Sequence, residues 1–220
     1  MKIKLIKIIL PIIIISALIA GCNKQDNNGM NKKTDSISGM MTTTKTEMEM
    51  MTSMNNIMNK MMTGMMDIKM TGDYDVDFAA MMIEHHKSAL EMSEAELRSG
   101  TDEKIKTMAK NIITAQKDEI SRMQEFLKKH KPVTGKMKMM MDPMKDMKGM
   151  NDMMKDAKSY NNADKDFVAA MIIHHQGAVT MAEGEVKDGM DSEIKKMAEQ
   201  MIIDQKKEIA DFQAWMNGSK

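Results

Sequence analysis

The chain has 220 residues with 32 basic and 32 acidic side chains, so its formal net charge at pH 7 is zero. Without a strong overall charge it has no long-range field that would attract nucleic acid, and we expect no nucleic-acid partner. Methionine supplies 34 residues, whereas aromatic residues make up only 3%, and the scarcity of aromatic and β-branched residues after the first 20 positions favours an all-α fold.

The start of the chain has the pattern of an export signal. Three early lysines precede an apolar run over residues 8–20, and Ala20-Gly21 comes directly before Cys22. This order resembles a bacterial lipobox, which implies that residues 1–21 are a signal peptide and that the Cys22 thiol is lipidated. An uncleaved anchor is the alternative, although the run is shorter than the roughly 20 apolar residues of a membrane span. Both interpretations predict a protein of the cell envelope, held at a membrane and facing the periplasm or the cell exterior.

Cys22 is the only cysteine. No other thiol is left for a disulfide or a thiolate metal site. Any soft-metal ligand must therefore be a methionine thioether or a histidine imidazole.

Residues 22–46 are mostly polar and predict a flexible tether. Residues 47–70 form a methionine-rich segment whose methionines recur at steps of three and four, typical of one helix face. These are Met50, Met54, Met58, Met61 and Met65. Because methionine is both a good helix former and a gap-filling core residue, the segment can pack as a helix, capture metal, or do both.

Residues 73–130 predict a helical hairpin. One helical stripe of the first helix comprises Phe78, Met82, His85, Ala89, Met92 and Glu96. This phase turns His85 inward and leaves His86 about 100° round the helix. Gly100 predicts a left-handed cap at the helix end. The apolar stripe of the second helix includes Gln116, and a buried amide needs a hydrogen-bond partner.

A second hairpin is predicted over residues 162–217, after a methionine-rich connector over residues 131–161. Residues 166–216 repeat residues 77–127 with 23 identities in 51 positions, which indicates an internal duplication. One hairpin cannot bury its apolar stripes alone. We therefore expect the two hairpins to form a single antiparallel four-helix bundle with methionine-rich flanking segments.

The motif from Asp77 to His86, repeated from Asp166 to His175, is followed in both copies by a second helix with Gln and Glu three positions apart. This pattern resembles the domain-of-unknown-function 305 family, whose members include exported copper-binding proteins. The resemblance covers about residues 73–217. It implies a ferritin-like bundle that binds Cu(I) or Ag(I) through Met and His, with metal buffering or chaperoning as its function and no organic cofactor.

Thioethers and imidazoles suit a soft ion such as Cu(I). Met82 lies three and four residues before the first histidine pair, so these side chains share one helix face. The candidate ligands are Met82, His85, His86, Met92, Met171, His174, His175 and Met181, with Met81, Met140, Met144 and Met147 as secondary candidates. Four polar residues are expected to surround the site: Gln116, Gln205, Glu96 and Glu185. Because His85 and His174 share a stripe with these residues, His86 and His175 are the favoured metal contacts.

Alternative functions are a methionine-rich oxidant sink, or an envelope interaction protein without a specific metal site. The paired histidines favour metal binding, since an oxidant sink has no use for them. We expect no enzyme, because a di-iron oxidase needs Glu-x-x-His pairs that the sequence lacks. The expected partners are metal ions, the membrane through Cys22, and another copper-handling protein.

Overall fold

The computed structural model describes residues 35–133, 149–150, 152–154 and 156–219, with side-chain environments from Met50 onward. The predicted signal with Cys22, and Met140, Met144 and Met147 of the connector, lie outside the described residues.

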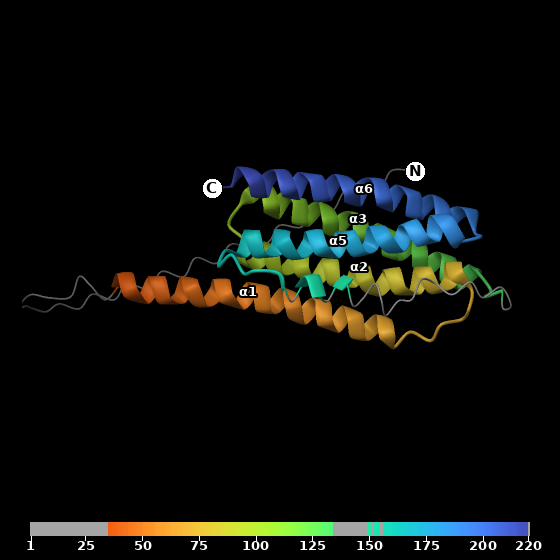
Figure 1. Ribbon diagram of the computed structural model, residues 1–220, viewed down its shortest axis with the longest axis horizontal. Helices are drawn as coiled ribbons and strands as arrows, with labels where there is room; N and C mark the ends of the chain where they lie inside the picture. Colours follow the sequence, from red (N-terminus) through yellow and green to blue (C-terminus); the bar gives the residue numbers. More distant parts are fainter. Residues whose placement is uncertain (1–34, 134–148, 151, 155, 220) are drawn as a thin grey trace, which may run out of the picture.

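The regular structure in the described part of the chain is helical: α1 (Asp35–Met66), α2 (Tyr74–Ser99), α3 (Glu103–Lys129), α5 (Ala163–Asp188) and α6 (Ser192–Gly218). Residues 149–150 and 152–154 are also helical. Helix α2 packs along α3, α5 packs along α6, and α2 and α5 pack against each other. Helix α1 runs beside α2 and α5 along one side of the bundle (Figure 1). The prediction of an all-α four-helix bundle with methionine-rich flanks is confirmed.

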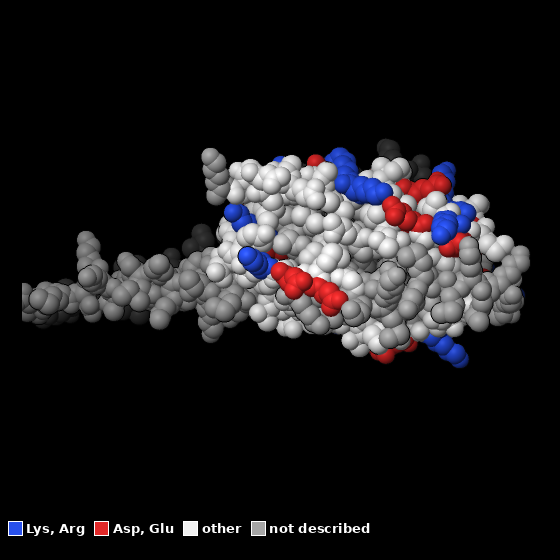
Figure 2. Space-filling view, in the orientation of Figure 1, with Lys and Arg blue, Asp and Glu red and all other residues white. Residues whose placement is uncertain are grey.

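The apolar character and the charge of the helices indicate which kinds of partner they could contact. None of the described helices combines the length and apolar character that crossing a membrane requires. On the face shown in Figure 2, acidic and basic side chains lie interspersed rather than in a patch of one sign. This distribution agrees with the zero net charge of the sequence.

Each hairpin helix begins at a side-chain cap. The side chains of Asp73, Asp102, Asn162 and Asp191 accept hydrogen bonds from backbone N–H groups of the first turn of α2, α3, α5 and α6. Such caps satisfy backbone donors that have no partner within the helix. They explain why the helices start where the sequence pattern predicts.

Helix α1 is longer than the sequence predicts, because residues 35–46, expected in the tether, are helical. Its methionine stripe is buried against the bundle: Met50, Met54, Met58, Met61 and Met65. Once this buried stripe fixes a helical nucleus, each further turn needs little additional stabilisation. The packed-helix interpretation of the methionine-rich segment is therefore confirmed for this stripe.

Gly100 does not adopt the predicted left-handed cap, since its φ is −69° and that of its counterpart Gly189 is −64°. Glycine is needed for space instead. A Cβ at Gly100 would overlap the carboxylate of Glu96, and one at Gly189 would overlap that of Glu185. Both glutamates fold back over the ends of their own helices.

Two acidic clasps join the hairpins. Asp164 at the start of α5 accepts hydrogen bonds of 2.9 Å from both backbone N–H groups of residues 101–102, just after α2. Asp75 at the start of α2 accepts equivalent 2.9 Å bonds from residues 190–191, just after α5. Since each helix start is bound to the end of the other helix, α2 and α5 run antiparallel and are related by a pseudo-twofold axis.

Each clasp also holds a buried glutamic acid. Burial and the neighbouring Asp164 carboxyl raise the pKa of Glu96 to about 8. Burial and Asp75 raise the pKa of Glu185 to about 9. Near neutral pH each carboxyl pair therefore keeps one proton, so the two side chains attract rather than repel each other.

The clasps predict that the free energy of unfolding falls as the pH rises from 5 to 9. Folded Glu96 and Glu185 hold protons that the unfolded chain releases near pH 4.5, so their contribution is complete below that value and is lost as pH rises through their folded pKa values. The limit is about 1.4 kcal/mol per pH unit for each group. Urea unfolding monitored by circular dichroism at pH 5, 7 and 9 measures the slope.

The double change Glu96→Gln and Glu185→Gln should flatten this slope, because glutamine stays neutral. Matched changes of the exposed Glu94 and Glu183 to Gln should leave it in place. An unchanged slope in the Glu96 and Glu185 variant would contradict the assignment.

Candidate metal centre

The two histidine pairs lie in the interior, where α2 and α5 cross. All four side chains, His85, His86, His174 and His175, are completely buried. The rings of His85 and His174 meet across the interface with centroids 3.8 Å apart and an interplanar angle of 41°. The helical phase placed His86 and His175 off the buried stripe, and the structure corrects this. Helices α2 and α5 are covered on more than one face, because each packs against its hairpin partner, the other central helix and α1.

A glutamate lies against each outer histidine. His86 Nε2 donates to Glu119 Oε2 at 2.8 Å. His175 Nε2 lies 2.8 Å from Glu208 Oε2, although without the alignment of a hydrogen bond. Because a carboxylate only accepts, Glu119 holds the proton of His86 on Nε2 and leaves the Nδ1 lone pair free. A carboxylate in this position also makes the imidazole a stronger metal ligand.

Neither glutamate is among the residues that the sequence predicts beside the histidines. The signal was present, since Glu119 and Glu208 are identical in the two repeats and follow Gln116 and Gln205 by one helical turn. Within the described residues the two glutamine amides have no hydrogen-bond partner. Glu96 and Glu185 belong to the clasps at the bundle ends. Among the described residues, the four polar side chains expected around the histidines therefore form no hydrogen bond with them.

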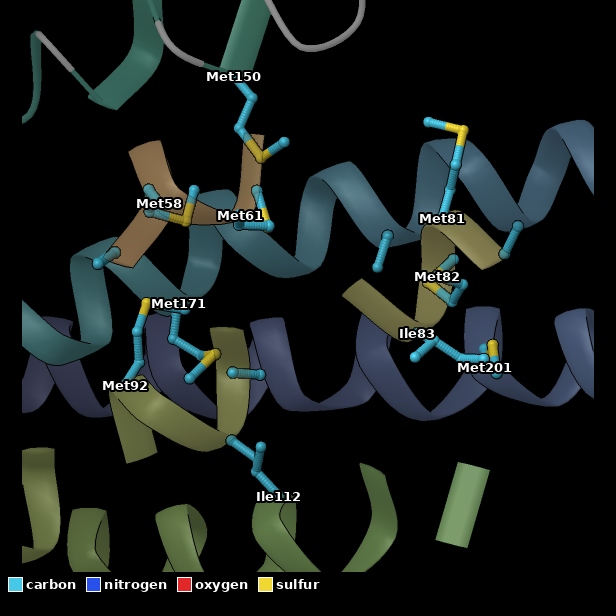
Figure 3. Close-up of a cluster of buried hydrophobic side chains, with 14 of the residues drawn as sticks. Met58, Met61, Met81, Met82, Ile83, Met92, Ile112, Met150, Met171 and Met201 are labelled. Atoms are coloured by element: carbon cyan, nitrogen blue, oxygen red, sulfur yellow. The ribbon is translucent and has the colours of Figure 1, made fainter. Parts of the chain in front are cut away.

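Two methionine sulfur atoms from the flanking segments lie beside Ser88 and Gly177, the two residues that border the central histidines. Ser88 Oγ lies 3.0 Å from Met61 Sδ of α1 and 2.7 Å from His174 Nε2. On the other side of the axis, Met150 Sδ and His85 Nε2 lie 3.0 and 3.4 Å from the point that a Cβ of Gly177 would occupy. Figure 3 shows Met150 pointing toward Met61 and Met58.

These contacts extend the duplication beyond the two hairpins. Met61 and Met150 are 89 positions apart, as are His85 and His174. Two turn residues with the same separation also share a left-handed conformation, with φ of 83° at Gly72 and 51° at Asn161. Neither Met61 nor Met150 was a candidate ligand from the sequence, and continuing the repeat spacing upstream of Asp77 would have found both.

The predicted methionine ligands of α2 and α5 lie in the core. Met81, Met82, Met92 and Met171 are buried and Met181 is partly buried in one continuous apolar cluster. In Figure 3, Met92 and Met171 extend into the same region between α2 and α5, while Met81 and Met82 lie further along the bundle. These predicted ligands therefore share the buried core of the bundle with the histidines.

The central histidines are neutral. Burial, followed by the neighbouring rings of His86 and His175, holds the pKa of His85 well below its usual value of 6.5. Burial and the ring of His85 do the same for His174. Neutral imidazoles keep the lone pair that a metal ion binds.

The arrangement suits a soft monovalent ion better than a hard divalent one. No group of three or more His, Cys, Asp or Glu side chains in the described part of the chain could hold a metal ion. The available donors are neutral nitrogen and thioether sulfur, which match Cu(I) or Ag(I) at low coordination number.

The similarity of the chain to a known protein family agrees with the duplicated helical hairpin. The family model described as a domain of unknown function (DUF305) matches residues 19–127 and again residues 75–216. These overlapping matches fit a chain that contains the same hairpin twice. No curated protein matches the chain.

Solved structures of CopM are similar to the chain. CopM in the Ag-bound form obtained by soaking has 28% sequence identity and a TM-score of 0.51, with 66% of this chain and 96% of that chain covered. CopM in the Cu(I)-bound form has 29% sequence identity and a TM-score of 0.51, with 66% of this chain and 98% of that chain covered. The apo form of CopM has 29% sequence identity and a TM-score of 0.51, with 66% of this chain and 97% of that chain covered.

The contact between Glu119 and His86 predicts a loss of stability when the carboxylate is removed. Glu119→Ala would leave a buried ring N–H without its acceptor, which costs about 1–3 kcal/mol of unfolding free energy. Glu119→Gln keeps an acceptor oxygen and should cost less. Urea unfolding at pH 7 measures both, with exposed Glu125→Ala on the same helix as control. An equal, small effect for the two alanine variants would rule out a structural role for Glu119.

Proposed function

The chain belongs to the family described as a domain of unknown function (DUF305), and on this premise we propose that it binds Cu(I) outside the cytoplasm to buffer or chaperone it. The similarity to CopM, which has been solved with Cu(I) and with Ag bound, supports a copper-related function. Ag(I) is the closest alternative cargo, because it is equally soft and monovalent.

One observation carries this proposal: the His85 imidazole is completely buried, and neither ring nitrogen has a hydrogen-bond partner among the described residues. An unsatisfied buried polar group costs about 1–3 kcal/mol. Coordination of a metal ion would supply the missing interaction. A neutral imidazole beside a thioether is thus better suited to metal binding than to structural packing.

The proposed donor set combines both repeats. His85 with Met150 forms one half of the centre, and His174 with Met61 forms the other. His86 and His175 can contribute through Nδ1, which has no partner in the part of the chain that the structure describes. The remaining candidate donors are Met81, Met82, Met92, Met171 and Met181 in the core, and Met140, Met144 and Met147 outside the described residues. Because all these ligands are neutral, they fit an ion that must be released again.

The alternative of an oxidant sink fits the structure less well. Oxidation of methionine requires exposed sulfur. The methionines of α1 and of the α2–α5 interface are mostly buried, and the large exposed ones among the described residues are Met66, Met70, Met153 and Met190. We propose no catalytic reaction for the protein.

We also propose a cellular location for the protein. The export signal and the lipobox-like sequence before Cys22 support a lipoprotein of the cell envelope. A lipid anchor would keep the bundle beside the membrane, where it could exchange copper with another copper-handling protein.

The proposal predicts that Cu(I) binding depends on the central histidines. The test is anaerobic titration of Cu(I) held by a chromophoric chelator into the full chain with Cys22→Ser, which removes the competing thiol. The double change His85→Ala and His174→Ala should weaken the tightest binding by roughly tenfold or more, since even outer-shell changes cause such losses. Circular dichroism would verify that the variant is folded.

His130→Ala is the matched control. This histidine lies at the bundle end, where it contacts Asp73 at 3.1 Å, and has no part in the proposed centre. Its replacement should leave Cu(I) affinity unchanged. Equal affinities for the reference chain and the His85 and His174 variant would remove the histidines from the function.

A further inference from the structure

The two halves of the metal centre differ at one pair of equivalent positions. Ser88 on α2 and Gly177 on α5 are 89 residues apart, and each lies beside the histidine of the other repeat. The histidines and the flanking methionines are the same in both halves. The chemical difference between the halves at this position is therefore one hydroxymethyl group.

On the Ser88 side, His174 Nε2 is engaged in the protein. It lies 2.7 Å from Ser88 Oγ and 3.0 Å from the backbone carbonyl oxygen of His85. Since a carbonyl only accepts, Nε2 carries the ring hydrogen. Before Nε2 can bind a metal ion, the proton must move to Nδ1 or leave, and both contacts must break. The single hydroxyl hydrogen of Ser88 can be donated to the backbone carbonyl oxygen of His85, 2.6 Å away, or to Met61 Sδ, 3.0 Å away.

On the Gly177 side these contacts are missing. Gly177 has no hydroxyl, and both nitrogens of His85 lack hydrogen-bond partners within the described residues. A Cβ at Gly177 would be 3.0 Å from Met150 Sδ and 3.4 Å from His85 Nε2, so a larger residue would crowd both donors. His85 can therefore bind an ion without breaking a hydrogen bond of its ring within the described residues.

We propose that Gly177 and Ser88 make the two halves unequal, so that His85 with Met150 takes the first soft metal ion and His174 with Met61 takes the second. This inference rests on the proposed function. The hydrogen bonds at His174 should weaken the second half by about tenfold relative to the first, the usual worth of such interactions. The rings lie only 3.8 Å apart, so a first bound cation also repels a second.

Unequal halves would give the protein one tighter and one weaker site. The tighter ion would be retained, whereas the weaker one would exchange with a partner. Ser88 and Gly177 thus act as positioning residues that set the order of loading without themselves providing the metal ligands.

The test is a titration of Ag(I), which is redox-inert, into the full chain with Cys22→Ser and with ¹⁵N-labelled histidine. NMR signals of the ring nitrogens report each histidine separately. In the reference chain the His85 signals should change first and the His174 signals only after further Ag(I) is added. His130 serves as an internal control.

Exchanging the two residues should change this order. Ser88→Gly should bring His174 loading to nearly the same Ag(I) concentration as His85. Gly177→Ser should delay His85 by about tenfold in Ag(I) concentration, matching the Ser88 side. Gly177→Ala separates crowding from the hydroxyl, and Ser88→Ala removes the hydroxyl while keeping the Cβ. The Ser88 variants keep the test decisive if a Gly177 variant does not fold.

The outcomes separate the inference from the function on which it rests. If His85 and His174 load together in the reference chain, or if their order is the same in the Ser88 variants, the inference is wrong and the copper site remains. If neither histidine responds to Ag(I), the proposed function fails and the inference falls with it. Loading of His85 first, with the order lost in Ser88→Gly, establishes the inequality.

Discussion

The antiparallel crossing of α2 and α5 is the constraint on which the rest of the molecule depends. Asp75 and Asp164 bind the loop after the opposite helix, and so fix the register of the crossing at both ends. With the ends fixed, His85 and His174 meet on the pseudo-twofold axis at a ring separation of 3.8 Å. A shift of one helical turn would separate the rings and move both sulfur atoms away from them.

The crossing also determines the chemistry of the centre. Burial keeps the central imidazoles neutral and thereby preserves their lone pairs. Glu119 and Glu208 lie 2.8 Å from the outer histidines, His86 and His175. Thioether sulfur enters from α1 and from Met150, which lie outside the four bundle helices. The proposed donors are therefore neutral groups from the two central helices, from α1 and from the segment of Met150, a set that suits a soft ion.

The sequence predicted the fold well because its signals are local and repeated. Apolar periodicity, capping residues and the 89-residue duplication are sufficient to place the two hairpins and their antiparallel packing. The same signals could not show which faces would be covered, so His86 and His175 were placed off the buried stripe. Backbone preference predicts a left-handed cap at Gly100, whereas the structure favours glycine there because a Cβ would overlap the carboxylate of Glu96.

The site was only partly predictable for a related reason. The histidine pairs stand out in the sequence, but the positions of Met61 and Met150 depend on how α1 and the short helical segment around Met150 pack against the bundle. Helical spacing predicts that Met82 pairs with the histidines of its own helix, because that spacing describes only a single helix. In the structure the sulfur atoms of Met61 and Met150 come from other segments and lie beside Ser88 and Gly177, next to the central histidines.

The most direct test of this account is X-ray absorption spectroscopy of the full chain with Cys22→Ser and one equivalent of Cu(I). A low-coordinate ion with both imidazole nitrogen and thioether sulfur among its ligands is expected, with loss of the imidazole scattering when His85, His86, His174 and His175 are all replaced. A shell of sulfur alone, or imidazole scattering that survives these replacements, would contradict a metal centre at the helix crossing.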